Sequence, residues 1–363
     1  MVSPQKQRFE SLQVLRGISA LAVLLYHSHE LGTSTLGAPP GFWNFFTFGH
    51  SGVDVFFVLS GFIMYYVHEN DLGKSSRLKP FVLKRGIRIY PIYWILTLAV
   101  LPAFYLAPES IKAYKHHPGF ILQCLALYPV NGLPIIPPAW SLSHELKFYG
   151  FFALAICLPT RFSRWLFGFM IALSLAVYSL QLLPGTHALV DALSGNHFLF
   201  FLIYPYNLEF AAGSLCAFIL KRYSPSKPIV IFAPGIFLFS VTAIVDNRGL
   251  MSEDWRILCY GVPSALLVLG TAACNFQSRS PVFRSLVFLG EASYSLYLIH
   301  YPACTIACIL LLKFGMVHAA GVTIATLLMV CFAVFSGCSF HWLVEKPILK
   351  AARRRLLKQE KEF

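Results

Sequence analysis

The sequence predicts an all-α integral membrane protein of about ten transmembrane helices, and three observations support this. Of the 363 residues, 57% are hydrophobic and only 12% are charged, about half the charged share of a soluble domain. The apolar residues fall into blocks close to the roughly 17–25 residues that span a bilayer as a helix. Lysine and arginine gather in every second connection, as in polytopic membrane proteins.

The apolar blocks predict one membrane domain over residues 1–363. Its helices are expected at about 11–30, 50–68, 87–106, 140–158, 164–183, 200–221, 228–245, 256–274, 293–313 and 317–342. Arg16 interrupts the start of the first block and no small-residue cleavage pattern follows it, so we expect a retained helix and no cleaved signal peptide. The longest connection, 107–139, is rich in proline and too short for a core of its own. No internal repeat is visible.

The distribution of basic residues predicts that both termini are cytoplasmic. One set of segments, around 6–16, 74–88, 161–164, 221–227, 279–284 and 346–361, is rich in lysine and arginine. The opposite set holds only Lys112, Lys115, Lys147, Arg248, Arg256 and Lys313. Basic connections stay in the cytoplasm, and two cytoplasmic termini require an even number of spans, in agreement with ten.

Several other functions are disfavoured by composition. The net charge of +13 is spread over short clusters between apolar blocks, which argues against nucleic-acid binding. The nine cysteines lie almost wholly inside apolar blocks and His116-His117 has no further ligand spacing, so no metal site is predicted. The basic run at 350–358 is expected to bind anionic membrane lipids.

The first predicted helix carries two ionisable residues, Arg16 and His27, which lie eleven positions apart. This is about three turns, so both side chains share one face about 16 Å apart along the axis. Arg16 is expected toward the cytoplasm and His27 toward the outer leaflet. A histidine can act as a general base at neutral pH, although a packed histidine that bonds a neighbouring helix remains an alternative.

The second predicted helix and the fourth supply acids near the outer end of the first. Asp54 opens the second helix, and Ser141 and Glu145 share one face of the fourth. Either acid could orient or charge-pair His27, and an interhelical structural pair is the alternative for each.

At the cytoplasmic start of the third predicted helix, Arg85 and Arg88 lie three positions apart on one face. Two guanidinium groups so placed can bind a phosphate or diphosphate; simple anchoring of the helix end is the alternative. Farther along, His300 is expected to be structural.

Six segments spread over the chain resemble the membrane acyltransferase-3 family, which includes bacterial O-acetyltransferases of exopolysaccharide and lipopolysaccharide sugars. They are Leu15–Gly17 with Tyr26–His27, Gly52–Phe62, Arg85 and Arg88 with Ile89–Trp94, Trp140–Glu145 before Phe148–Tyr149, Gly290–His300 and Glu345–Pro347. The chain is most similar to the short succinoglycan and xanthan type of exopolysaccharide acyltransferase. His144 stands where valine is frequent in the family.

The resemblance implies an enzyme of the bacterial inner membrane with acetyl-CoA as acyl donor. Arg16, Arg85 and Arg88 would hold the donor phosphates from the cytoplasm, and His27 would deprotonate the acceptor hydroxyl. The acceptor implied is a sugar of an exopolysaccharide or of a polyprenyl-linked repeat unit. Trp140, Ser141 and Tyr149 are candidate contacts for that substrate, and an aromatic belt at the membrane interface is the alternative for the two rings.

A transporter or flippase for a glycan or lipid-linked precursor is the competing function. Ten helices with buried charges also describe carriers, which contain inverted repeats and broken helices in corresponding halves. Neither feature is evident in this sequence.

Overall fold

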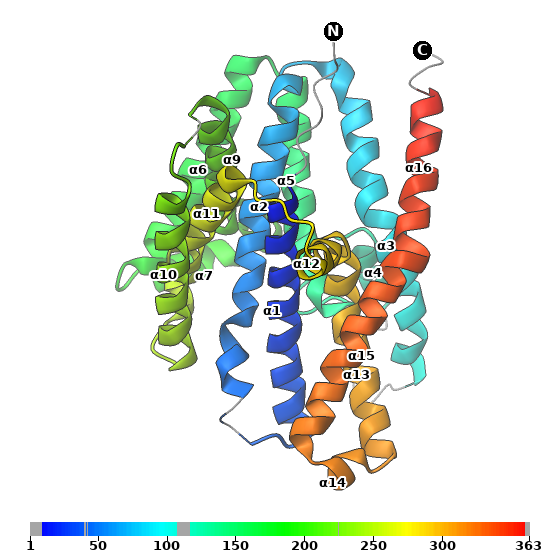
Figure 1. The fold of residues 1–363 in the computed structure, drawn as a ribbon. Helices are drawn as coiled ribbons and strands as arrows, with labels where there is room; N and C mark the ends of the chain where they lie inside the picture. Colours follow the sequence, from blue (N-terminus) through cyan, green and yellow to red (C-terminus); the bar gives the residue numbers. More distant parts are fainter. Residues whose placement is uncertain (1–8, 40, 42, 107–116, 224, 360–363) are drawn as a thin grey trace.

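A computed structural model describes residues 9–39, 41, 43–106, 117–223 and 225–359 as a helical bundle (Figure 1). Over these ranges the chain forms helices and no strand, which confirms the all-α prediction. Lys6, Arg8, Lys112, Lys115, His116 and Lys361, used above for orientation or as a possible metal ligand, lie outside the described residues.

Ten long helices correspond to the ten apolar blocks. They are α1 (Glu10–Ser34), α2 (Gly52–His68), α3 (Leu78–Leu106), α5 (Trp140–Cys157), α6 (Thr160–Leu182), α9 (Tyr206–Arg222), α10 (Ile229–Asn247), α11 (Arg256–Cys274), α13 (Ser293–Lys313) and α15 (Val322–Phe340). The shorter helices are α4 (Pro118–Leu125), α7 (His187–Ser194), α8 (His197–Ile203), α12 (Pro281–Glu291), α14 (Met316–Ala320) and α16 (Lys346–Gln359).

The structure departs most from the predicted blocks at three helix boundaries. The block at 200–221 is divided into α8 and α9 because Tyr204, before Pro205, is extended at φ −58° and ψ 140°. The block at 317–342 is divided at Gly321, whose φ of 80° interrupts the helix before α15. Helix α3 begins nine positions before residue 87, at Leu78, since its basic first turns are helical but not apolar.

Eight helical stretches of the described chain are long and apolar enough to cross a membrane. They include every one of the ten long helices except α1 and α5. A multi-pass membrane protein is therefore confirmed. The count of ten spans and the cytoplasmic termini stay predictions.

The more polar helix α1 lies inside the bundle, in contact with α2, α11, α12, α13 and α15 (Figure 1). Its crossing with α12 is close because both helices have glycine there. A Cβ atom at Gly290 would lie 1.9 Å from the carbonyl oxygen of Gln13, and one at Gly17 would lie 2.8 Å from the nitrogen of Gly290. This crossing holds the first turns of α1 beside the start of α13.

A π-helical turn, His341–Glu345, joins α15 to α16. The Glu345 carboxylate accepts hydrogen bonds from Ser295 Oγ at 2.6 Å and from His341 Nδ1 at 2.7 Å. These bonds tie the beginning of α16 to the beginning of α13.

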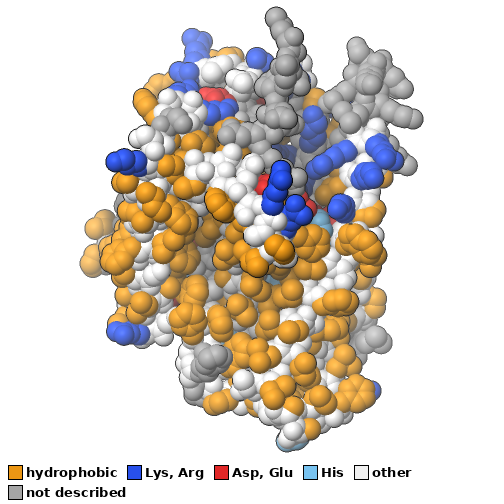
Figure 2. Space-filling view, in the orientation of Figure 1, with side chains coloured by type: hydrophobic (Ala, Val, Ile, Leu, Met, Phe, Trp, Pro, Cys, Tyr) orange, Lys and Arg blue, Asp and Glu red, His pale blue; other side chains and the backbone are white. Residues whose placement is uncertain are grey.

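Figure 2 shows hydrophobic side chains over most of the lower half of the visible face, with most Lys and Arg side chains of that face above them.

Candidate active site

A cavity of about 810 Å³ lies between α1, α2, α3, α5, α13 and α16. It gathers residues from the first and last helices of the described chain, among them Arg16 of α1 and Arg353 of α16. Six of the nine predicted site residues line it: Arg16, Arg85, Arg88, Ser141, Glu145 and Tyr149. The other three, His27, Asp54 and Trp140, lie elsewhere.

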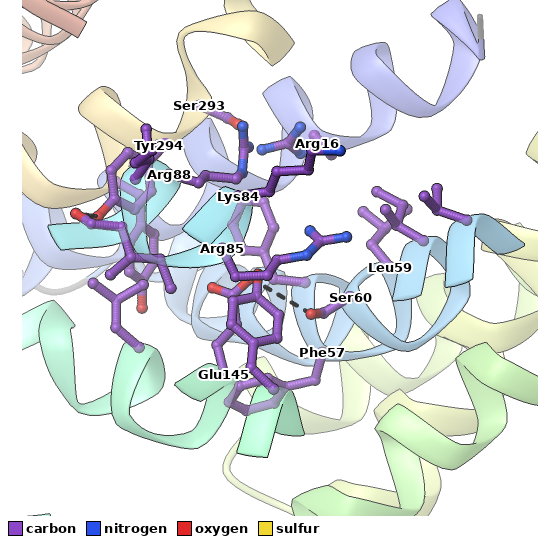
Figure 3. Close-up of a pocket in the computed structure, with 18 of the residues that line it drawn as sticks. Arg16, Phe57, Leu59, Ser60, Lys84, Arg85, Arg88, Glu145, Ser293 and Tyr294 are labelled. Carbon is purple, nitrogen blue, oxygen red and sulfur yellow. Dashed lines mark hydrogen bonds between the residues drawn. The ribbon is translucent and has the colours of Figure 1, made fainter. Parts of the chain in front are cut away.

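The lining of the cavity is strongly basic at one end. Among the described residues that line it, five are lysine or arginine and two are carboxylates: Arg16, Lys84, Arg85, Arg88 and Arg353, against Asp71 and Glu145. Figure 3 shows Arg16, Arg85 and Arg88 extending into this space from α1 and α3. An excess of positive charge within low-dielectric walls favours an anionic ligand.

Arg85 is held in position by its neighbours. Its Nη2 atom lies 2.9 Å from Nε2 of His68, and its guanidinium carbon lies 5.2 Å from the centre of the Tyr149 ring. Since arginine only donates hydrogen bonds, His68 Nε2 is the acceptor. The His68 proton therefore lies on Nδ1, which donates to Asp71 at 2.8 Å. This relay fixes the planar guanidinium against the cavity wall.

The other end of the cavity is aromatic and apolar, with a few hydroxyl groups. Phe56, Phe57 and Leu142 line it, together with Ser141 and Tyr297. The hydroxyl oxygens of Ser141 and Tyr297 lie 2.8 Å apart. This end can hold a long neutral chain with a few polar atoms.

Glu145 lies within the cavity and contacts groups from α2 and α5. Its Oε1 atom accepts a hydrogen bond from Tyr149 and a longer one, of 3.5 Å, from Ser60 Oγ. Figure 3 marks the bond to Ser60.

Trp140 lies outside the cavity lining. Its ring packs on those of Phe57 and Tyr206, whose centres lie 6.3 Å and 5.7 Å from that of Trp140.

Asp54 forms an interhelical ion pair. Its carboxylate is fully buried and Oδ2 lies 2.9 Å from Nη2 of Arg256, the first residue of α11. Of the two alternatives left open for Asp54, these contacts match the structural pair. Arg256 lies 202 positions further along the chain, and no local sequence pattern indicates that pairing.

His27 contacts a different carboxylate from the two that were predicted. Its Nδ1 lies 2.9 Å from Oε2 of Glu30, three residues along the same helix. The spacing of three could have indicated Glu30 from the sequence. The His27 ring also stacks on His300, with ring centres 5.2 Å apart and planes inclined by 25°.

A row of side chains joins His27 to the cavity. His300 is fully buried and its ring lies 5.8 Å from that of Tyr297, which lines the cavity beside Ser141. The aromatic end of the cavity and the predicted histidine are thus connected through side-chain contacts, which run from Tyr297 through His300 to His27. In the described part of the chain, no group of three His, Cys, Asp or Glu side chains is arranged to hold a metal ion.

This multi-pass membrane protein has an acyltransferase domain: residues 9–344 match the acyltransferase-3 family, described as an acyltransferase domain, and the chain belongs to this family. Helix α16 lies beyond the matched residues. No solved structure matches the chain.

Three relatives illustrate the range of names within the family. The exopolysaccharide production protein ExoZ of Rhizobium meliloti is 29% identical over 85% of this chain and 92% of its own length. The acyltransferase MdmB of Streptomyces mycarofaciens is 27% identical over 97% of this chain and 94% of its own. The peptidoglycan O-acetyltransferase OatA of Listeria monocytogenes is 25% identical over 82% of this chain and 49% of its own.

Proposed function

We propose that this protein transfers an acetyl group from cytoplasmic acetyl-CoA to a sugar hydroxyl of an exopolysaccharide or of its lipid-linked repeat unit, in the bacterial inner membrane. The observation that carries the proposal is the basic cavity inside the bundle and its connection through Tyr297 and His300 to His27. The similarity to ExoZ and OatA, whose names specify exopolysaccharide and peptidoglycan, supports a carbohydrate acceptor.

The two ends of the cavity suit the two parts of acetyl-CoA. Arg85 and Arg88 lie on one face of α3 beside Arg16, and their planar guanidinium groups match phosphate oxygens. The pantetheine arm is long, neutral and sparsely polar, as is the aromatic end that contains Ser141 and Tyr297. The acetyl group would then lie toward His300.

In the proposed reaction His27 is the general base. Nδ1 of His27 donates to Glu30, so Nε2 is left with a lone pair. Nε2 takes the proton of the acceptor hydroxyl as that oxygen attacks the thioester carbon. The carbon–sulfur bond breaks, and the proton passes from His27 to the leaving CoA thiolate. Water must be kept from the thioester during this step because it would hydrolyse the bond, and the buried rings around His300 exclude it.

The proposal is tested with the purified protein in lipid nanodiscs, supplied with acetyl-CoA and a soluble methyl hexopyranoside. Free CoA thiol is measured with and without the sugar, and the sugar is analysed by mass for one added acetyl group. Acceptor-dependent CoA release with acetylated sugar is the expected result. Transport of the sugar across proteoliposomes without any thiol release would instead identify a carrier.

A further inference from the structure

Ser293 has a buried hydroxyl group that the helix bundle leaves without a partner. Its side chain is 1% exposed, yet it lines the cavity. Within the described residues, Ser293 Oγ has no hydrogen-bond partner. Buried hydroxyl groups are almost always hydrogen-bonded, because an unmade bond in the interior costs stability. A ligand in the cavity would supply the missing partner.

The surroundings of Ser293 indicate which kind of ligand this is. Figure 3 shows the Ser293 side chain at the same end of the cavity as the guanidinium groups of Arg16 and Arg88. The close glycine crossing of α1 and α12, at Gly17 and Gly290, fixes Arg16 relative to the start of α13. Two positive groups and one neutral hydroxyl donor suit a phosphate with several acceptor oxygens.

The helix that Ser293 begins adds to this preference. Helix α13 is 21 residues long, and Ala292 before it provides no side-chain cap. The N-terminal end of a helix has a partial positive charge, and it stabilises phosphate groups placed near it. Ser293 and Tyr294, the first two residues of α13, both line the cavity.

We propose that Ser293 Oγ, Arg16 and Arg88 form a phosphate subsite and that it holds the diphosphate of acetyl-CoA. The inference rests on the proposed function for its choice of ligand. Burial distinguishes this subsite from the mouth of the cavity, where Lys84 and Arg353 are exposed. The diphosphate lies between the nucleoside and the pantetheine arm, so it belongs at the deeper basic position, with the arm continuing toward Tyr297.

The test compares the full-length protein with its Ser293→Ala variant in binding experiments that need no acyl acceptor. The dissociation constants for CoA and for pantetheine, which has no phosphate, are measured in nanodiscs by calorimetry. We expect Ser293→Ala to weaken CoA binding about tenfold, as for the loss of a hydrogen bond to a charged group. Pantetheine affinity should not change. Ser285→Ala, at an exposed position of α12, is the matched control and should bind CoA like the unchanged protein.

The stability of the variant provides a second readout. Since Ser293 Oγ has no partner within the described residues, its removal should not lower the Tm of the ligand-free protein. The rise in Tm on adding CoA should be smaller for Ser293→Ala. Equal CoA affinity in both proteins would overturn the proposal, as would an equal loss of pantetheine affinity or a lower ligand-free Tm.

Two further arms separate this inference from the proposed function. If the unchanged protein binds inorganic pyrophosphate but not CoA, and Ser293→Ala weakens that binding, the phosphate subsite stands while the acetyl-CoA donor fails. If the unchanged protein binds neither pyrophosphate nor CoA, the phosphate subsite and the acetyl-CoA donor are both overturned. The nanodiscs are prepared with phosphatidylcholine alone and with added phosphatidylglycerol. A Ser293 effect that depends on the anionic lipid and not on CoA would assign the subsite to a lipid headgroup, against the proposal.

Discussion

Two charged side chains inside this bundle bind partners on another segment. Asp54 binds Arg256 and so connects α2 to α11, and Arg85 binds His68 at the end of α2. Unpaired charges in a bilayer are expensive, which makes such partners necessary. The cavity differs, because its basic side chains outnumber its carboxylates among the described lining residues. That excess is the feature that favours an anionic substrate.

Replacement of His27 tests its role as the general base. We expect His27→Ala to lower acceptor-dependent acetyl transfer by about 10²–10⁴-fold, the range that general base catalysis contributes. CoA affinity should stay unchanged, because His27 is outside the lining of the donor cavity. The initial rate of CoA thiol release and the dissociation constant of CoA are the two measurements.

The matched control for this variant is His318→Ala, an exposed histidine in α14, which should keep the full rate. Glu30→Gln should lower the rate less than His27→Ala does, because the amide oxygen can still accept from Nδ1 of His27. Undiminished transfer by His27→Ala would contradict the assignment of the base.

Local spacing predicted some of the site residues and missed others for a physical reason. Arg85 and Arg88 are neighbours on one helical face, so their joint position could be read from the sequence. The shared face of Arg16 and His27 could also be predicted from their spacing. Their different surroundings could not be predicted, because Arg16 lines the cavity while His27 stacks on His300. Contacts between distant helices depend on packing, which leaves no periodic signal.

At the scale of elements, hydropathy predicted the long helices and was less informative about their ends. Pro205 divides α8 from α9, and Gly321 precedes α15. Helix α16 shows the limit most clearly. Its basic sequence is typical of a lipid anchor, yet Leu349 and Arg353 on it line the cavity. The π-helical turn His341–Glu345, from which α16 continues beside α3, is bonded to α13 through Ser295, and this placement cannot be read from the composition of α16.

Arg353 is expected to contribute to donor binding from α16. Since it is exposed at the mouth of the cavity, we expect it to contact the 3′-phosphate of CoA. Arg353→Ala should raise the KM for acetyl-CoA by about two- to fivefold, the effect of a solvent-screened charge contact of up to about 1 kcal/mol. The KM for acetyl-dephospho-CoA should be the same with and without the substitution.

Arg354→Ala is a closely matched control, because Arg354 is the next residue of α16, is also exposed and is outside the cavity lining. It should leave the KM for both donors unchanged. Equal effects of the two substitutions would mean that the positive charge of α16 acts on the membrane surface and not on the donor.

For the whole molecule, the site combines two long helices that fall outside the apolar spans with α2, α3 and α13, which lie within them. Helices α1 and α5 supply Arg16, His27 and Glu145 and are the two long helices that fall outside the eight apolar spans. Helix α1 packs against five other helices and α5 against α2, α3, α6 and α9. This packing shields the polar residues of α1 and α5 from lipid.

We expect the basic end of the cavity to open to the cytoplasm. Membrane vesicles of known orientation test this. Basic segments are retained on the cytoplasmic side, and acetyl-CoA is too highly charged to cross a bilayer. We expect inside-out vesicles to transfer acetyl groups from added acetyl-CoA, and right-side-out vesicles to do so only after permeabilisation.

Detergent should make the two vesicle preparations equally active, which controls for differences in protein content. The Ser293→Ala and Arg353→Ala effects on the KM for acetyl-CoA should appear in intact inside-out vesicles, since both residues line the donor cavity. Activity of intact right-side-out vesicles alone would place the donor cavity on the outer side. The charge asymmetry would then reflect only the insertion of the helices, and the assignment of Arg16, Arg85 and Arg88 to a cytoplasmic donor would be wrong.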